Sequence, residues 1–269
     1  MPRALLLAVA VSLLGAATPD PDQIVRQSVE AIQSDWAQAP GYSYIERDAE
    51  SKRSAPLTAK TYKVLMIDGS PYNLVTAVND QPRAPGEQAE ELHKLRREIE
   101  KRQHESERDR EKRIAKYDRE NAHDHEMLRV MVDAFQFQLA GEAAVDGHAC
   151  WVLDAAPKPG YRPATREGRI LEGMRGRLWV DQRTYQWVKV HAEVVRPVSF
   201  HRFLAKVAPG TEFDLEQSPV TDNLWLAKRF SVRVKASALG IFDEDSTEID
   251  TYRDYQPMPQ PSALLQSIR

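Results

Sequence analysis

The stretch from Phe135 to Tyr255 is a succession of short segments rich in β-branched and aromatic residues, most of them joined by short turns. Several segments alternate apolar with polar residues, as the run from Phe230 to Ser237 does. Alternate side chains of a strand point to opposite faces, so a period of two is typical of half-buried strands. Consecutive strands with short links predict an antiparallel meander. We therefore expect a mainly β (α+β) fold built on a large curved antiparallel sheet or unclosed β-barrel.

The first seventeen residues have the layout of a secretory signal peptide. Arg3 precedes an apolar run from Ala4 to Leu14, and small residues follow at positions 15–17. The run is about a dozen residues long, whereas a membrane-spanning helix needs roughly 20. We expect cleavage near Ala17, export to the periplasm, and a mature chain without a transmembrane span. An uncleaved N-terminal anchor is the alternative.

Two helical regions are expected outside the strand segments. From Pro21 to Gln38, apolar residues recur at helical spacing, and Val25, Val29, Ile32 and Trp36 are expected to form one stripe. Residues 86–133 are mostly charged, with the two signs interleaved, which predicts a long solvated helix or a helical hairpin inserted between strands. The predicted organisation is a signal peptide at 1–17, one domain at 18–256 that contains this insertion, and a Pro-rich tail at 257–269.

Composition and motifs argue against several functions. The net charge is −3, which provides no strong field for nucleic acid, so no nucleic-acid partner is expected. The single cysteine, Cys150, lies in an apolar strand-like run and is expected to be a buried, inert thiol. His123 and His125 are two positions apart, so on a helix they diverge and lack the i, i+4 spacing of a zinc site. No metal, no cofactor and no catalytic residue is predicted.

Four tryptophans, Trp151, Trp179, Trp187 and Trp225, all fall in predicted strands. Large apolar side chains repeated on a curved sheet line either a packed core or an apolar ligand cavity. The sequence leaves both interpretations open.

One segment carries a family resemblance. Residues 176–194 have a Gly-x-Leu-Trp-Val-Asp strand, a short turn and a strand with Val188-Lys189-Val190, and they resemble the LolA/LolB-like periplasmic proteins. Residues 222–234 are similar to the next hairpin of that group. More narrowly, the chain resembles exported bacterial proteins with a long charged helical insert before an FxFxLxGE strand, here residues 135–142.

The LolA/LolB group includes outer-membrane lipoprotein carriers and a periplasmic regulator that senses lipoproteins. The resemblance implies a half-barrel with helices across a concave apolar face, which in the carriers holds acyl chains. The expected function is non-enzymatic binding of a lipid, acyl chain or lipoprotein. The residues expected to line the ligand are Tyr62, Val64, Met66, Leu178, Val180, Val188, Val190, Phe230, Val232 and Val234.

Two alternatives stay open. The charged helical region could dock an envelope protein partner, which would make this an interaction or signalling-regulator protein. A hydrolase whose site is dispersed along the sequence is the less favoured alternative, because every chain of this size contains Ser, His and Asp.

Overall fold

The computed structural model describes residues 19–53, 55–199, 206–235, 245–259 and Leu264. The expected signal peptide lies outside these residues. The chain folds into helices and strands with the following bounds: α1 Pro21–Gln38, a 3-10 turn Ala39–Gly41, β1 Tyr42–Lys52, β2 Ala55–Ile67, β3 Ser70–Val78, β4 Gln81–Pro82, α2 Pro85–Gln103, α3 Glu107–Ala134, β5 Phe135–Val145, β6 His148–Pro157, α4 Arg166–Glu172, β7 Met174–Asp181, β8 Trp187–Val194, β9 Val198–Ser199, β10 Lys206–Val207, β11 Glu212–Thr221, β12 Leu224–Val234 and β13 Ser246–Pro257.

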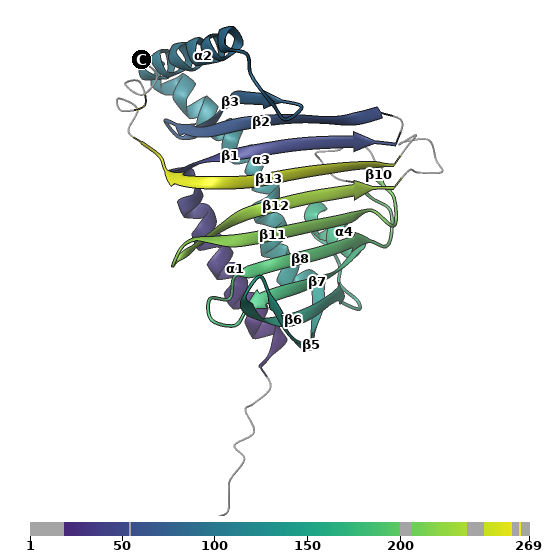
Figure 1. The fold of residues 1–269 in the computed structure, drawn as a ribbon. Helices are drawn as coiled ribbons and strands as arrows, with labels where there is room; N and C mark the ends of the chain where they lie inside the picture. The colour runs from purple at the N-terminus through teal and green to yellow at the C-terminus, as the bar shows by residue number, and fades with distance from the viewer. Residues whose placement is uncertain (1–18, 54, 200–205, 236–244, 260–263, 265–269) are drawn as a thin grey trace, which may run out of the picture.

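Eleven strands form one antiparallel sheet in the order β4-β3-β2-β1-β13-β12-β11-β8-β7-β6-β5 (Figure 1). The sheet is open, with β4 and β5 at its two edges, while β9 and β10 form a separate two-stranded pair. The predicted mainly β fold with a large antiparallel unclosed sheet is confirmed.

The chain enters this sheet in the middle. It begins at β1, builds outward to β4, and then crosses through α2 and α3 to the opposite edge at β5. From β5 the meander returns to β13, which pairs with β1. The charged helices α2 and α3 are therefore the connection between the two edges of the sheet.

We call the side of the sheet that packs against α1 and the end of α3 the inner face. Helix α1 crosses it from β5 to β12, and Asp20 caps the start of the helix by accepting from the amide of Asp22. The main core lies between these helices and the sheet, and its buried members include Val25, Ile32, Leu128, Leu153, Leu178 and Val180. Helix amphipathicity thus seals one face of a sheet that would otherwise expose its apolar side chains.

The end of α1 differs from the predicted stripe. Asp35, and not Trp36, is the residue that turns toward the sheet and is buried. Trp36 is half-buried and stacks on His125 of α3, with ring centroids 4.6 Å apart. The stripe continues from Ile32 by three positions because three- and four-residue steps both stay on one helix face.

Helices α2 and α3 are both hydrogen-bonded to the β2–β3 turn. Arg102 of α2 donates from Nη1 to the carbonyl oxygens of Ile67 at 2.7 Å and Ser70 at 2.9 Å. Arg113 of α3 donates to the Ser70 hydroxyl at 2.7 Å. A second apolar cluster joins α2 to the same strands, and its buried members are Leu65, Ile67, Leu74, Leu95, Ile99 and Leu264.

Candidate ligand-binding face

A row of apolar side chains crosses four strands of the inner face. Leu178 pairs with Val190, Val190 with Leu215, and Leu215 with Phe230. Directly paired residues of antiparallel strands point to the same face, so these four side chains are neighbours. Leu178 is fully packed, whereas Val190, Leu215 and Phe230 are half-buried.

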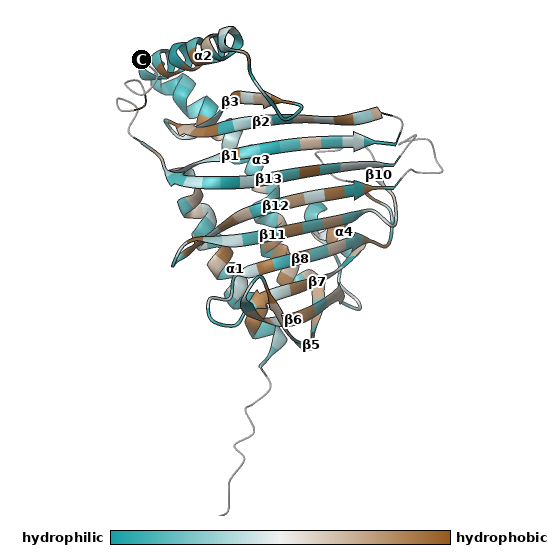
Figure 2. Ribbon diagram, viewed as in Figure 1, coloured by the Kyte–Doolittle hydropathy of each residue, from teal (hydrophilic) through white to brown (hydrophobic). Residues whose placement is uncertain are grey.

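The next row continues the same apolar surface. Ala192 pairs with Phe213, and Phe213 pairs with Val232. We define the inner-face strip as the half-buried residues of the two rows, which are Val190, Ala192, Phe213, Leu215 and Phe230. All but Phe230 pack against the core under α1 and α3. The apolar bands of these strands are visible in Figure 2.

Of the ten residues predicted to line a ligand, six lie in or beside this region. Leu178 and Val180 are buried in the core that the strip adjoins, and Val190 and Phe230 belong to the strip. Val232 and Val234 follow Phe230 on the same face of β12, and both are buried. Sequence reasoning missed Phe213 and Leu215, although the alternation in residues 212–216 could have indicated them.

The structure places Val188 elsewhere, in a small cluster with Cys150 and Trp225. The pairing of β7 with β8 shifts between Trp179 and Val180, so Trp187 and Val188 together oppose Val180. Such a bulge breaks the strict alternation of faces.

Tyr62, Val64 and Met66 lie on β2, which is separated from β12 and Phe230 by the two strands β13 and β1. On the inner face, Phe230 pairs with Asp250, and Asp250 pairs with Asp48 of β1. These two carboxylates separate the strip from the side chains of β2, so the ten predicted residues do not form one continuous surface.

Tyrosines lie beside Asp48 and Asp250, and we call these carboxylates and tyrosines together the polar band. Tyr44 lies 5.2 Å from Tyr255 and 6.0 Å from Tyr252, measured between ring centroids. Burial, reinforced by nearby carboxylates such as Glu46, raises the pKa of Tyr44, Tyr252 and Tyr255 far above the usual tyrosine range. These hydroxyls therefore stay protonated and act as neutral hydrogen-bonding groups.

Three carboxylates of this band come together. Oxygens of Asp48, Glu248 and Asp250 lie within 4.8 Å of one another, and the Tyr252 hydroxyl contacts Asp250 at 3.5 Å. Carboxylate oxygens are ligands of hard cations such as Ca²⁺ and Mg²⁺. Sequence reasoning missed this group because Asp48 and Asp250 meet only through the pairing of β1 with β13.

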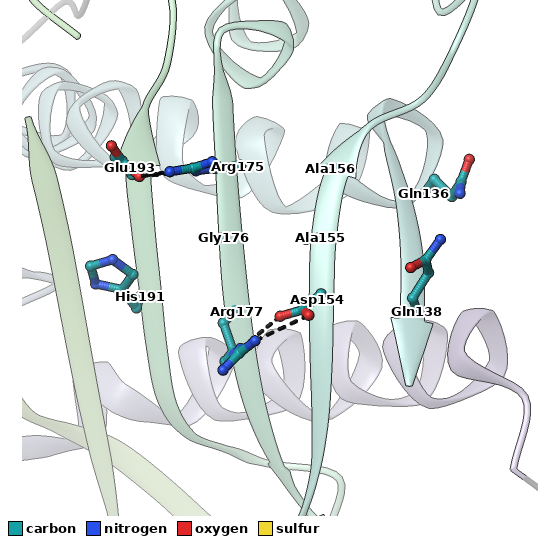
Figure 3. A pocket seen from close by; sticks show the side chains of 10 residues that line it. All are labelled: Gln136, Gln138, Asp154, Ala155, Ala156, Arg175, Gly176, Arg177, His191 and Glu193. Atoms are coloured by element: carbon teal, nitrogen blue, oxygen red, sulfur yellow. Dashed lines mark hydrogen bonds and ion pairs between the residues drawn. The ribbon is translucent and has the colours of Figure 1, made fainter. Parts of the chain in front are cut away.

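The opposite face of the sheet carries a polar groove of about 420 Å³ across β5 to β8 (Figure 3). Arg177 donates to both carboxylate oxygens of Asp154, at 2.6 and 3.1 Å, and Arg175 donates to Glu193 at 2.6 Å. His191 Nδ1 lies 2.9 Å from an oxygen of Asp214. These charges are mutually satisfied across neighbouring strands, as cross-strand pairs commonly are.

Cys150 is buried next to a His–Asp pair but lacks the properties of a nucleophile. His148 Nδ1 lies 3.3 Å from Asp181, the residue that pairs with Cys150 on the neighbouring strand. Burial, and then the charge of Asp181, raises the pKa of the Cys150 thiol to about 11. The reactive thiolate is therefore scarce at neutral pH, as predicted for an inert thiol.

No helix among the residues that the structure describes combines the length and the apolar character needed to cross a bilayer.

No family model matches the chain, and no curated protein matches it. Among solved structures, it is similar to a LolA superfamily protein from Nitrosomonas europaea, with 11% identity, coverage of 92% and 97% of the two chains and a TM-score of 0.35. A putative outer membrane lipoprotein-sorting protein domain from Vibrio parahaemolyticus has 12% identity, 91% and 99% coverage and a TM-score of 0.34. The Mycobacterium tuberculosis lipoprotein LppX has 9% identity, 89% and 96% coverage and a TM-score of 0.30. At these TM-scores the similarities carry no conclusion about what this chain binds.

Proposed function

We propose that this protein is an exported, periplasmic, non-enzymatic protein that binds the acyl chain of a lipid or lipoprotein along the inner-face strip. The observation that carries the proposal is the half-buried state of five contiguous apolar side chains on a sheet face already covered in part by helices. Apolar surface of this kind gains about 25 cal/mol for each Å² that a ligand removes from water.

The rows of the strip suit an elongated ligand. Val190, Leu215 and Phe230 follow one another across three adjacent strands, which spans roughly 10 Å at a spacing of about 4.8 Å per strand. At one end the row meets the packed Leu178, and at the other it meets Asp250. An acyl chain would lie along the apolar row, while a polar head group would reach the band of carboxylates and tyrosines.

Native mass spectrometry of protein purified from membranes, with delipidated protein as the control, tests for a bound lipid. A fluorescent fatty-acid probe then tests the location. Leu215→Gln is expected to weaken probe binding about tenfold, because it places an amide in the apolar row. Val220→Gln, on the same strand and also half-buried, is the matched control. Equal binding by both variants would refute the strip as the site.

A second candidate function rests on the charged helices α2 and α3. Their anchoring by Arg102 and Arg113 holds α2 beyond β3 at one end of the molecule, where its charged side chains could dock an envelope protein. Deleting the two helices would remove the connection between the sheet edges, so the suitable test is charge reversal at exposed positions. Arg97→Glu combined with Lys101→Glu should abolish capture of a partner from envelope extracts while leaving the acyl probe bound.

A further inference from the structure

Asp35 is an acidic side chain in an unexpected place. It lies on the face of α1 that packs on the sheet and is 1% exposed, whereas Asp22 and Glu30 of the same helix are exposed. No donor among the described residues comes within hydrogen-bonding geometry of either carboxylate oxygen. A buried carboxylate without a cation or a full set of donors is costly in its ionised form.

Apart from burial, the groups that affect the pKa of Asp35 are polar and uncharged. The backbone amide of Trp225 and the side chain of Gln186 lie near the carboxylate and favour its ionised form, yet burial outweighs them. Gln186 Oε1 and Trp225 Nε1 are themselves buried without hydrogen-bond partners in the described part of the chain. The end of α1 is therefore seated on a small polar patch at the ends of strands β8 and β12.

Two histidines belong to the neighbouring elements. His125 of α3 stacks on Trp36, the residue next to Asp35. His148 of β6 packs edge-on against Trp225, with centroids 4.7 Å apart. Neither contributes to the pKa of Asp35, which burial raises from 3.8 to about 6. The carboxyl group thus changes its charge within the range of pH values found in different cellular compartments.

The direction of the effect follows from the sign of this shift. A carboxyl whose pKa is higher in the docked state binds its proton more tightly there, so docking is favoured at low pH and weakens as pH rises through the raised pKa. A difference of about two pKa units corresponds to a change on the order of a hundredfold in the docking equilibrium.

We propose that Asp35 is a protonation switch for α1: the neutral acid lets the C-terminal half of the helix stay seated on β12, and the carboxylate loosens it. Because α1 crosses the inner face from β5 to β12, loosening its end uncovers that face. The switch concerns the helix itself and holds whether or not the strip binds an acyl chain.

Amide hydrogen exchange of the full chain without added lipid tests the switch. Protection of residues 30–38, corrected for the intrinsic exchange rate, should fall about tenfold between about pH 5 and about pH 7.5, because most of the hundredfold change lies between the free and the raised pKa. Asp35→Asn, a neutral side chain of the same shape, should keep high protection at both values. Glu30→Gln removes an exposed carboxylate from the same helix and should behave like the wild type.

Two results would overturn the proposal: wild-type protection that does not change with pH, or a pH dependence that survives in Asp35→Asn and so belongs to His125 or His148. A measurement on the wild type alone guards against a variant that fails to fold. Fluorescence of Trp36 and Trp225 should change with a midpoint at about pH 6, and a signal that is flat through this range would also overturn the proposal.

Discussion

Trp187 donates its indole N–H to the hydroxyl of Ser28 across 3.2 Å, and this contact joins β8 to α1 inside the core. Ser28 in turn donates to the carbonyl of Val25, at 2.9 Å. Ser28→Ala leaves the buried indole N–H without its acceptor, which should cost about 1–3 kcal/mol of unfolding free energy. Urea unfolding measures this, with the exposed Ser34→Ala on the same helix as the control. Equal losses in the two variants would contradict a structural role for the contact.

Arg102 is expected to contribute most of the polar stabilisation that holds α2 on the β2–β3 turn. Arg102→Ala leaves the Ile67 and Ser70 carbonyls without this donor and removes one of the two basic partners of Glu98, so a loss of about 3 kcal/mol is expected. Chemical unfolding compares this variant with Arg97→Ala, which removes an exposed arginine from the same helix and should change stability by less than about 0.5 kcal/mol. A loss below about 1 kcal/mol would show that the apolar cluster alone holds α2 on β2 and β3.

Gly176 permits the close approach of β7 to β8. A Cβ at this position would lie 2.8 Å from the carbonyl oxygen of His191, which is backbone and cannot give way easily. Gly176→Ala is therefore expected to destabilise by about 1–3 kcal/mol and to weaken acyl-probe binding, because Ala192 and the strip lie next to it. Gly86→Ala, where a Cβ meets nothing within 4 Å, is the control for thermal unfolding. If Gly176→Ala left the stability unchanged, β7 and β8 would be able to move apart without a cost in free energy.

Asp181 should add stability that is lost in acid. Burial alone would raise its pKa, but the Thr184 hydroxyl and amide, the Arg183 amide and His148 together hold the pKa below the usual value. A lowered pKa contributes stability above about pH 4, and that stability disappears as pH falls through the lowered value. The difference in unfolding free energy between wild type and Asp181→Asn should therefore shrink steadily below about pH 4. A difference that is constant with pH would contradict this assignment.

The element types could be read from short-range patterns. The alternation from Phe230 to Val234 produces a strand, and Asp20 with Pro21 begins a helix at the predicted residue. The interleaved charges of residues 86–133 produce helices, with Ser106 capping the second of them. The row that contains Leu178, Val190 and Phe230 was also foreseeable in part, because each side chain occupies the apolar phase of its own strand.

Other features had no local signal. The bulge at Trp187 and Val188 moves Val188 out of the apolar row, although the spacing in the sequence is regular. At the end of α1, a stripe that could continue to Trp36 turns Asp35 to the sheet instead. The choice depends on how α1 meets β12, which no pattern within the helix records.

Secondary structure and the phase of each strand are thus contained in the amino-acid sequence, because they depend on residues a few positions apart. Tertiary structure alone decides that β1 pairs with β13, that α2 and α3 connect opposite edges of the sheet, and that carboxylates interrupt the apolar face. The physical reason is that these contacts join residues far apart in the chain, and their free energy depends on the assembled sheet.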